Sequence, residues 1–379
     1  MNSLVIALLA GCLSSFNGWT VPLPQDTPAV RKSLPAKQGG ALEIDVEPGS
    51  VELEPWDKQE VVVETDDIDE QHPERLSMTQ SGNAIHVQYK DRRWSTGNIQ
   101  FHINLPAEFS VNIRTSGGNV VQRDWMKGSL TVNTQGGNIE IERHAGNVDA
   151  HSGGGNIKAD SIDGDALFKT GGGNVTVRAT TGMVNVESGG GNIHVMGVRK
   201  SLDIRTGGGS ITLGDIEGTS KVHTGGGSLR TGRLSGVAQL ETGGGNIEVL
   251  GASQEMNVKS GGGTVKLHQI AGPINVTTGG GNIDIDLLAS SGGQSLIHSG
   301  GGDILLSIPE NAHASIHALV TERSSWGSRH KRIDIRSEFK ADSFDRKDDE
   351  IEATYTLNGG GHSVDVETSN GIINIRKLK

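Results

Sequence analysis

The sequence repeats one glycine-rich phrase at a fixed spacing. Three glycines are followed by a short polar residue and then by an aliphatic one. The last glycine of each triplet recurs at every eighteenth residue, at Gly155, Gly173, Gly191, Gly209, Gly227, Gly245, Gly263 and Gly281. Gly-Gly pairs at 117–118 and 136–137 and a further triplet ending at Gly302 continue the series. A strict period of this length is typical of a solenoid, in which each repeat packs only against its neighbours.

Aligned on the triplets, the repeats share columns of aliphatic residues with polar residues between them. Positions are counted from the residue after each triplet. The second and fourth positions are mostly aliphatic, as are the eleventh and thirteenth, for example Leu202 and Ile204. Many seventh positions are aliphatic too, as at Ile162. This alternation predicts two short strands in each repeat, each with one face toward the core.

We therefore predict an all-β fold: a single-stranded parallel β-helix, or β-solenoid, of 18-residue coils with irregular β caps at both ends. A right-handed coil is the expected hand. Coils stacked in register would place every triplet directly beside the next one. Glycine is expected there for two reasons, a left-handed φ angle and the absence of a side chain that would collide. The eight triplet-ending glycines are accordingly predicted to be structural turn residues.

The opposite corner of each coil is expected to be less constrained. It has a single glycine at the ninth position in most coils, but Lys200 and Gln254 occupy that position in two of them. Stacking also predicts ladders. A Ser/Thr column precedes the triplets and an Asn-rich column follows them, and both can hydrogen-bond from coil to coil. Outward charges alternate in sign, as in Arg230, Glu248 and Lys266, which indicates lateral pairs that hold the register.

The regions outside the repeats alternate like strands without the 18-residue period, and a solenoid needs such caps to cover its open edges. The predicted organisation is a signal peptide with a lipobox (1–12), a Pro-rich tether (13–38), an N-terminal β cap (39–115), β-helix repeats (116–302), and C-terminal β coils with a cap (303–379). Two solvated loops are expected at 322–331 and 340–350. The first holds Trp326, Arg329 and His330, which form a candidate interaction loop.

The only cysteine of the chain, Cys12, ends the phrase "LLAGC" after a short apolar run. This phrase is typical of the site at which bacterial lipoprotein signal peptides are cut and the new N-terminal cysteine receives lipid. The apolar run is too short to span a bilayer, which takes about 20 residues. We therefore predict lipid attachment at Cys12, and a cysteine within a non-lipidated secretion signal is the alternative.

Composition excludes several classes of function. The net charge of −11 and the pI of about 5.6 argue against a nucleic-acid partner. The glycine phrases lack the regular aspartates of calcium-binding nonapeptide repeats, and no phosphate-binding loop is present. The histidines are too scattered for a metal site. We predict no metal, no cofactor and no enzymatic activity.

The coil phrase "SGGGNI", the opening "LEIDVEPGSVELEPWDKQEVVVE" and the closing "TYTLNGGGHSVDVETSNGIINIRK" resemble a bacterial putative-adhesin family of unknown function with β-strand repeats. That family is related to the head domains of auto-transporter adhesins. The resemblance covers residues 40–379. It implies a β-helix on the cell envelope.

Three functional hypotheses follow. The first is an exported, membrane-anchored lipoprotein of the bacterial cell envelope, periplasmic or surface-exposed, that acts as a non-catalytic structural or adhesion-like module with a protein or glycan partner. The second is a carbohydrate-binding or carbohydrate-modifying β-helix, although the repeats are poor in the aromatic rings that sugar clefts favour. The third is a scaffold that polymerises end to end. A further hypothesis is that backbone amides at the triplets bind anionic glycans.

Overall fold

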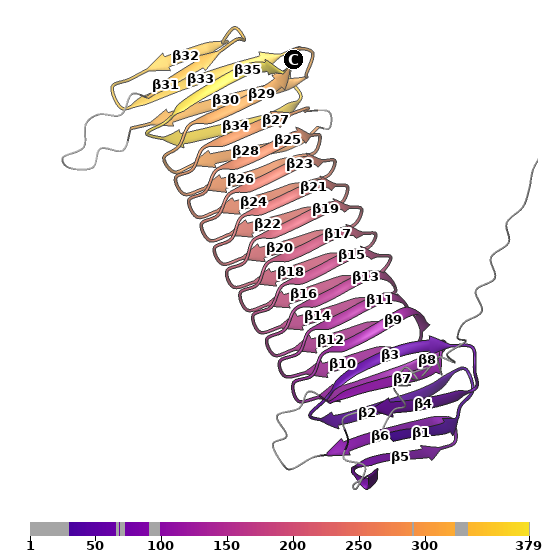
Figure 1. Ribbon diagram of the computed structural model, residues 1–379. Coiled ribbons are helices and arrows are strands. Elements are labelled where there is room, and N and C mark those ends of the chain that lie inside the picture. Colours follow the sequence, from indigo (N-terminus) through magenta and orange to yellow (C-terminus); the bar gives the residue numbers. More distant parts are fainter. Residues whose placement is uncertain are drawn as a thin grey trace, which may run out of the picture.

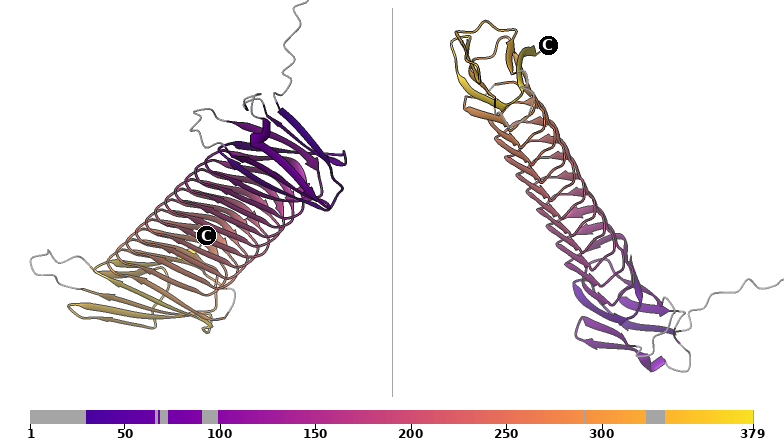
Figure 2. Two further views of the ribbon diagram at one scale, coloured as in Figure 1. Left: turned by 90° about the horizontal axis from the view of Figure 1, so that it is seen from below. Right: turned by 90° about the vertical axis from the view of Figure 1, so that its left-hand side faces the viewer.

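The computed structural model describes residues 30–65, 68, 73–90, 99–289, 292–322 and 333–378. These residues form a rod of stacked β-coils (Figures 1 and 2). Each central coil contributes one strand to sheet A and one strand to sheet B, and like strands pair in parallel along the rod. The all-β solenoid predicted from the 18-residue period is confirmed. Within the described ranges, no helix is long and apolar enough to cross a membrane.

The strands of sheet A follow one another along the rod in an order that departs from chain order at both ends. From the N-terminal end they are β1 (Val30–Pro35), β4 (Glu60–Thr65), β7 (Gln100–Pro106), β3 (Ser50–Trp56), β9 (Val120–Lys127), β11 (Ile139–Ala145), β13 (Ile157–Asp163), β15 (Val175–Thr180), β17 (Ile193–Val198), β19 (Ile211–Ile216), β21 (Leu229–Leu234), β23 (Ile247–Ala252), β25 (Val265–Ile270), β27 (Ile283–Leu287), β29 (Ile304–Pro309), β35 (Ile372–Leu378) and β31 (Asp334–Ser337).

Sheet B lies on the other side of the core. Its strands, in the same direction, are β5 (Leu76–Ser81), β6 (Ala84–Lys90), β2 (Gly40–Glu47), β8 (Phe109–Thr115), β10 (Leu130–Thr134), β12 (Val148–Ser152), β14 (Ala166–Thr170), β16 (Val184–Ser188), β18 (Leu202–Thr206), β20 (Ser220–Thr224), β22 (Ala238–Thr242), β24 (Met256–Ser260), β26 (Ile274–Thr278), β28 (Gln294–Ser299), β34 (His362–Ser369), β30 (Ala314–Thr321), β33 (Glu350–Leu357) and β32 (Ser343–Arg346). A 3-10 turn, η1 (Pro73–Arg75), precedes β5.

The core is a thin slab between the two sheets. It is built from the second, fourth, seventh, eleventh and thirteenth positions, as the alternation predicted. In the coil after Gly155, these positions are filled by Ile157, Ala159, Ile162, Ala166 and Phe168, and all five are buried. Because no single coil encloses this apolar row, each coil depends on the coils above and below it.

The corner at the glycine triplets, here called the triplet corner, is held by close backbone contact between coils. A Cβ atom on the third glycine of a triplet would lie 1.9 to 2.1 Å from a carbonyl oxygen of the preceding coil, at every one of the eight predicted positions. A Cβ atom on the middle glycine, such as Gly208, would have no heavy atom within 4 Å. The third glycine is therefore a packing contact, whereas the middle one faces open space.

One of the two expected reasons for glycine at this corner is wrong. The eight triplet-ending glycines lie outside the left-handed φ region, and left-handed glycines occur instead at Gly128 and Gly146, on the opposite corner of the first coils. The triplet corner turns in ordinary backbone conformations. Close stacking alone explains why the first and third positions need glycine.

The predicted ladders are present and run from coil to coil. The hydroxyl of Thr170 donates to the carbonyl oxygen of Gly155 in the preceding coil at 2.8 Å, and it accepts the N–H of Gly173 in its own coil at 3.1 Å. The amide oxygen of Asn138 accepts the backbone N–H of Asn156 at 2.8 Å. These bonds use side chains to satisfy backbone groups that the turn leaves outside the sheets.

The ends of the rod contain coils that are stacked out of chain order. At the N-terminal end, the coil β2–β3 lies between β6–β7 and β8–β9. At the C-terminal end, the coil β34–β35 lies between β28–β29 and β30–β31. The hydroxyl of Thr115 donates to the carbonyl oxygen of Gly49, and that of Thr368 donates to the carbonyl oxygen of Gly302, both at 2.6 Å. These coils therefore repeat the hydroxyl-to-glycine hydrogen bond of the triplet corner.

The edge strands β1 and β5 pair antiparallel with their neighbours at the N-terminal end, and the edge strands β31 and β32 have only four residues each at the C-terminal end. Strands β1 and β5 end the two sheets on one side, and β31 and β32 end them on the other. Short edge strands limit pairing with other chains. The segment 340–350 was predicted as a loop, but it contains β32, whose four residues are all exposed. The loop prediction is wrong for those residues because β32 pairs with β33.

Candidate functional site

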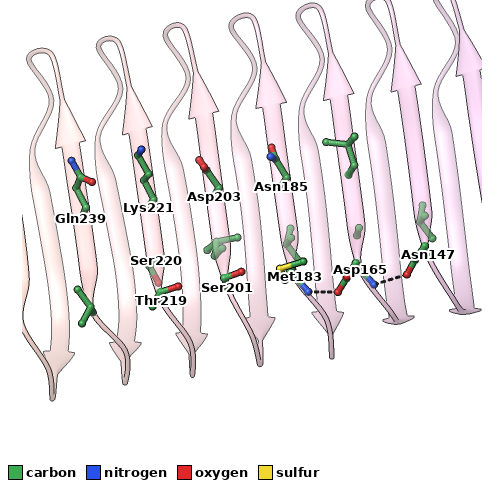
Figure 3. Close-up of a pocket in the computed structure, with 16 residues that line it drawn as sticks. Asn147, Asp165, Met183, Asn185, Ser201, Asp203, Thr219, Ser220, Lys221 and Gln239 are labelled. Carbon is green, nitrogen blue, oxygen red and sulfur yellow. Dashed lines mark hydrogen bonds between the residues drawn. The ribbon is translucent and has the colours of Figure 1, made fainter.

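The outer face of sheet B carries a shallow hollow that crosses six strands, from β12 to β22 (Figure 3). Its volume is about 660 Å³. Two columns of outward side chains flank it. Figure 3 shows Asn147, Asp165, Met183, Ser201 and Thr219 along the tenth position, and Asn185, Asp203, Lys221 and Gln239 along the twelfth. The hollow follows the axis of the rod because each column repeats in every coil.

Apolar atoms form much of this hollow. Met183 and Val237 are 50% and 51% exposed, and both belong to the tenth column. The inward eleventh position also lines the hollow, and it holds the small residues Ala166 and Ser220 where Met256 stands in a later coil. Met183 precedes β16 and Val237 precedes β22 in the chain, so the two exposed apolar side chains lie at separate points along the recess.

Polar side chains in the hollow divide into those that serve the fold and those that face solvent. The side-chain oxygen of Asn147 accepts the N–H of Asp165 at 3.3 Å, and that of Asp165 accepts the N–H of Met183 at 2.8 Å. Asp203 pairs with Arg205 at 2.9 Å. Lys221 makes no ion pair with any residue that the structure describes, so its ammonium group is available to a ligand.

Further hollows extend the same face along the rod. One of about 480 Å³ lies at the N-terminal end and is lined by Glu43, His86, Asn112 and Thr131, which continue the twelfth column. Two others, of about 470 and 400 Å³, lie at the edge beside the triplet corner, where Lys169 lines both of them. Sheet B therefore presents two parallel lines of shallow recesses.

A histidine with a lowered pKa lies in the core of the described coils. Burial lowers the pKa of His144, whose Nε2 lies 3.0 Å from the carbonyl oxygen of Gly128. This side chain faces the core at a seventh position, away from the hollows. Among the described residues, no group of three or more His, Cys, Asp or Glu side chains is placed to hold a metal ion. The recesses of sheet B, in contrast, can make contacts with a molecule that lies along the surface of the rod.

Comparison with protein families gives a match to Toastrack DUF4097 over residues 40–376. The chain belongs to this family. The match begins after β1 and spans the coils from β2 into β35, so it includes the end coils that are stacked out of chain order. No curated protein matches the chain.

Three solved structures are similar to this Toastrack DUF4097 chain. A "putative cell adhesion protein" from Clostridium sporogenes is 9% identical with a TM-score of 0.17, and the alignment covers 93% of this chain and 100% of that one. A "putative adhesin" from Bacteroides fragilis is 12% identical with a TM-score of 0.21, covering 92% and 96%. A "putative lipid binding protein" from Parabacteroides distasonis is 13% identical with a TM-score of 0.24, covering 68% and 93%.

The residues singled out in the sequence fall into two groups. Cys12 and the loop residues Trp326, Arg329 and His330 lie outside the described residues. The eight triplet glycines line up along one ridge of the rod, each beside the backbone of the preceding coil. That ridge is separate from the line of hollows that includes Met183.

The hollow of sheet B was not predicted. Its signal in the sequence is the pair of apolar residues Met183 and Val237 at the tenth position, where the other coils that line the recess have Asn, Asp, Ser or Thr. The second signal is small side chains at the eleventh position, at Ala166 and Ser220. Neither is conspicuous in one coil, and they become a recess only when neighbouring coils are stacked.

Proposed function

We propose that this chain is a non-catalytic, adhesion-like interaction module of the bacterial cell envelope, and that the outer face of sheet B is its binding surface. The observation that carries the proposal is the recess of about 660 Å³ from β12 to β22, continued by one of about 480 Å³ in the same columns. A surface of this shape suits an extended partner that lies along the rod.

The recess supplies two kinds of contact. Met183 and Val237 provide exposed apolar area, and Lys221 and Gln239 provide polar groups that can orient a partner. The coil backbone is held by hydrogen bonds to both neighbours, as at Ala166 and Val184. The surface is therefore preorganised, which lowers the entropy that binding must offset.

Adhesion measured with beads tests this proposal. Beads coated with the full chain are expected to adhere to bacterial cells, and Met183→Asp and Val237→Asp are each expected to reduce adhesion several-fold. Leu296→Asp is the matched control, because Leu296 is 41% exposed on the same sheet but does not line the recess. Equal adhesion by all three variants and the unmodified chain would contradict the role of this surface.

Carbohydrate binding is the second candidate function. The hydroxyl and amide side chains of Ser201, Thr219, Asn185 and Gln239 line the recess and can bond to sugar hydroxyls. Phe168, the only Phe, Trp or Tyr between 127 and 322, is fully buried, so the described residues of that range supply no aromatic platform. Inhibition of bead adhesion by soluble polysaccharides, lost in Gln239→Ala, would favour this function over protein binding.

We also propose that Cys12 carries a lipid that anchors the chain to a membrane. The phrase Leu9-Ala10-Gly11-Cys12 supports this proposal, and so does the proline-rich stretch that follows it. Mass spectrometry of the mature N-terminus should find an acylated cysteine. Cys12→Ser or inhibition of the lipoprotein signal peptidase should leave the precursor uncut. A mature chain that begins elsewhere without lipid would overturn the proposal.

A further inference from the structure

The outer face of sheet A carries a column of charges on its third coil position. Neighbouring residues in this column are paired in register on adjacent strands. From β11 to β27 the column consists of Glu140, Lys158, Thr176, His194, Thr212, Arg230, Glu248, Lys266 and Asp284. Lys158 pairs with Glu140 at 2.6 Å and Arg230 with Glu248 at 2.8 Å within the chain. The charges lie at the two ends of the column, with uncharged residues between them.

The charges of this column are complementary to those of an identical column that runs in the opposite direction. Consider a twofold axis that lies parallel to the strands, midway between β17 and β19. It places the column of a second copy over the first in reverse order. Glu140 then faces Lys266 of the second copy, and Lys158 faces Glu248. Because the arrangement is symmetric, each of these opposite-charge contacts occurs twice.

The fifth position forms the next outward column of sheet A. The side chains of this column in the two copies fit together about the same axis. Met196 is 45% exposed on β17, and the neighbouring strand has Gly214 at this position. The axis places Met196 over Gly214 of the second copy, where no side chain fills the space. Leu250, which is 51% exposed, would cover Asp160, a carboxylate already paired with Arg178 at 3.9 Å.

Other arrangements of the two faces bring like charges together. A slip of one coil in one direction places Glu140 opposite Asp284 and Lys158 opposite Lys266. A slip in the other direction places Glu140 opposite Glu248. A parallel arrangement places the third column over the fifth. Glu140 then meets Glu142 and Asp284 meets Asp286, and these two like-charge contacts outnumber the opposite-charge contact of Lys158 with Asp160. Like-charge contacts of this kind exclude wrong registers.

We propose that the chain forms an antiparallel, twofold-symmetric dimer through the outer face of sheet A, with Lys158 facing Glu248 across the interface. The strands from β11 to β25 face one another across this axis and cover roughly 600 Å² on each copy at the usual strand spacing, which is at the lower limit for a specific interface. Sheet B stays open on both copies. The dimer therefore presents two binding surfaces that face away from each other.

Two charge-reversal variants of the full chain test the register directly. Lys158→Glu creates two contacts between carboxylates in the dimer, and Glu248→Lys creates two contacts between ammonium groups. Sedimentation equilibrium should show that each variant alone has a dimer Kd raised by at least about tenfold. An equimolar mixture should restore association as a heterodimer, because both contacts between positions 158 and 248 then join opposite charges again.

Sheet B supplies matched controls. Lys169→Glu and Glu187→Lys reverse a pair that lies 3.2 Å apart on that sheet, beside similar neighbours, and both should dimerise like the unmodified chain. Circular dichroism should show the same β content in all four variants. A monomeric unmodified chain would overturn the proposal. So would single sheet A variants that dimerise normally, or a mixture of those two variants that stays monomeric.

Discussion

The two corners of each coil stack on the neighbouring coils in different ways. At the triplet corner, the third glycine of one coil lies against the backbone of the next, and a buried hydroxyl such as that of Thr224 links the two. At the opposite corner, Lys200 and Gln254 replace the glycine of other coils. The buried side chains there differ from coil to coil, and Thr180 has no hydrogen-bond partner among the described residues. The triplet corner, which is the same in successive coils, thus sets the spacing between coils. The opposite corner, which varies, adapts to that spacing.

The largest effect is expected from adding a methyl group at the triplet corner. In Gly209→Ala the new Cβ would lie 1.9 Å from the carbonyl oxygen of Gly191, and this contact is between backbones that cannot move aside. Overpacking of this kind costs about 1–3 kcal/mol or more. Gly208→Ala is the control, since its Cβ meets nothing within 4 Å, and it should be neutral or stabilising by up to about 1 kcal/mol.

Chemical unfolding of the two alanine variants measures this difference. If Gly208→Ala destabilises the chain as much as Gly209→Ala, the close contact between coils is not the reason for glycine at the third position.

The second effect concerns the hydroxyls of the two corners. Thr224 is fully buried, donates to Gly209 at 2.8 Å and accepts from the N–H of Gly227 at 3.1 Å. Thr224→Val leaves both backbone groups unpaired, which should cost about 1–3 kcal/mol. Thr180→Val removes a buried hydroxyl that has no partner within the described residues, so it should be neutral or stabilising. Equal losses of unfolding free energy would contradict the distinction between the corners.

A smaller effect is expected in the pH dependence of stability. Burial lowers the pKa of His144, at the opposite corner, below its usual value near 6.5. The unfolded chain therefore binds a proton more readily, and this residue makes stability fall as the pH drops below about 6.5. His144→Ile should flatten the fall between pH 7 and 5, as measured by thermal unfolding. An unchanged fall in His144→Ile would contradict this contribution of His144.

The central coils were predictable because their pattern is local. The spacing of the triplets predicted the length of each coil. The columns that contain Ile157 and Phe168 predicted which face of each strand points toward the core. The prediction of left-handed φ angles at the triplets was wrong. Glycine can be required by the backbone conformation of a turn or by a close contact, and the spacing of glycines in the sequence does not distinguish the two. The 19-residue step from Gly118 to Gly137 marks an extra residue, and the structure places Asp124 there in a left-handed conformation, beside a register shift between β9 and β11.

The ends and the recess were beyond prediction for physical reasons. The coil β2–β3 stacks between two later coils, and β34–β35 stacks between two earlier ones, so their partners are far away in the chain. No periodic signal encodes such a jump. The recess depends on the sizes of side chains from different coils, such as Ala166 and Val237, which become neighbours only through stacking.

Deletion of one complete coil tests whether the 18-residue coil is the repeating unit of the rod. Removing residues 192–209 takes out 18 residues and joins Gly191 to Ser210, so every column stays in register. We expect a folded chain with one cooperative unfolding transition and a rod shorter by about 4.8 Å in small-angle scattering. Removing 192–200, which is half a coil, should abolish that transition because it takes out β17 and leaves the coil of β18 without a strand in sheet A. Equal behaviour of the two deletions would mean that the 18-residue coil is not the unit of this fold.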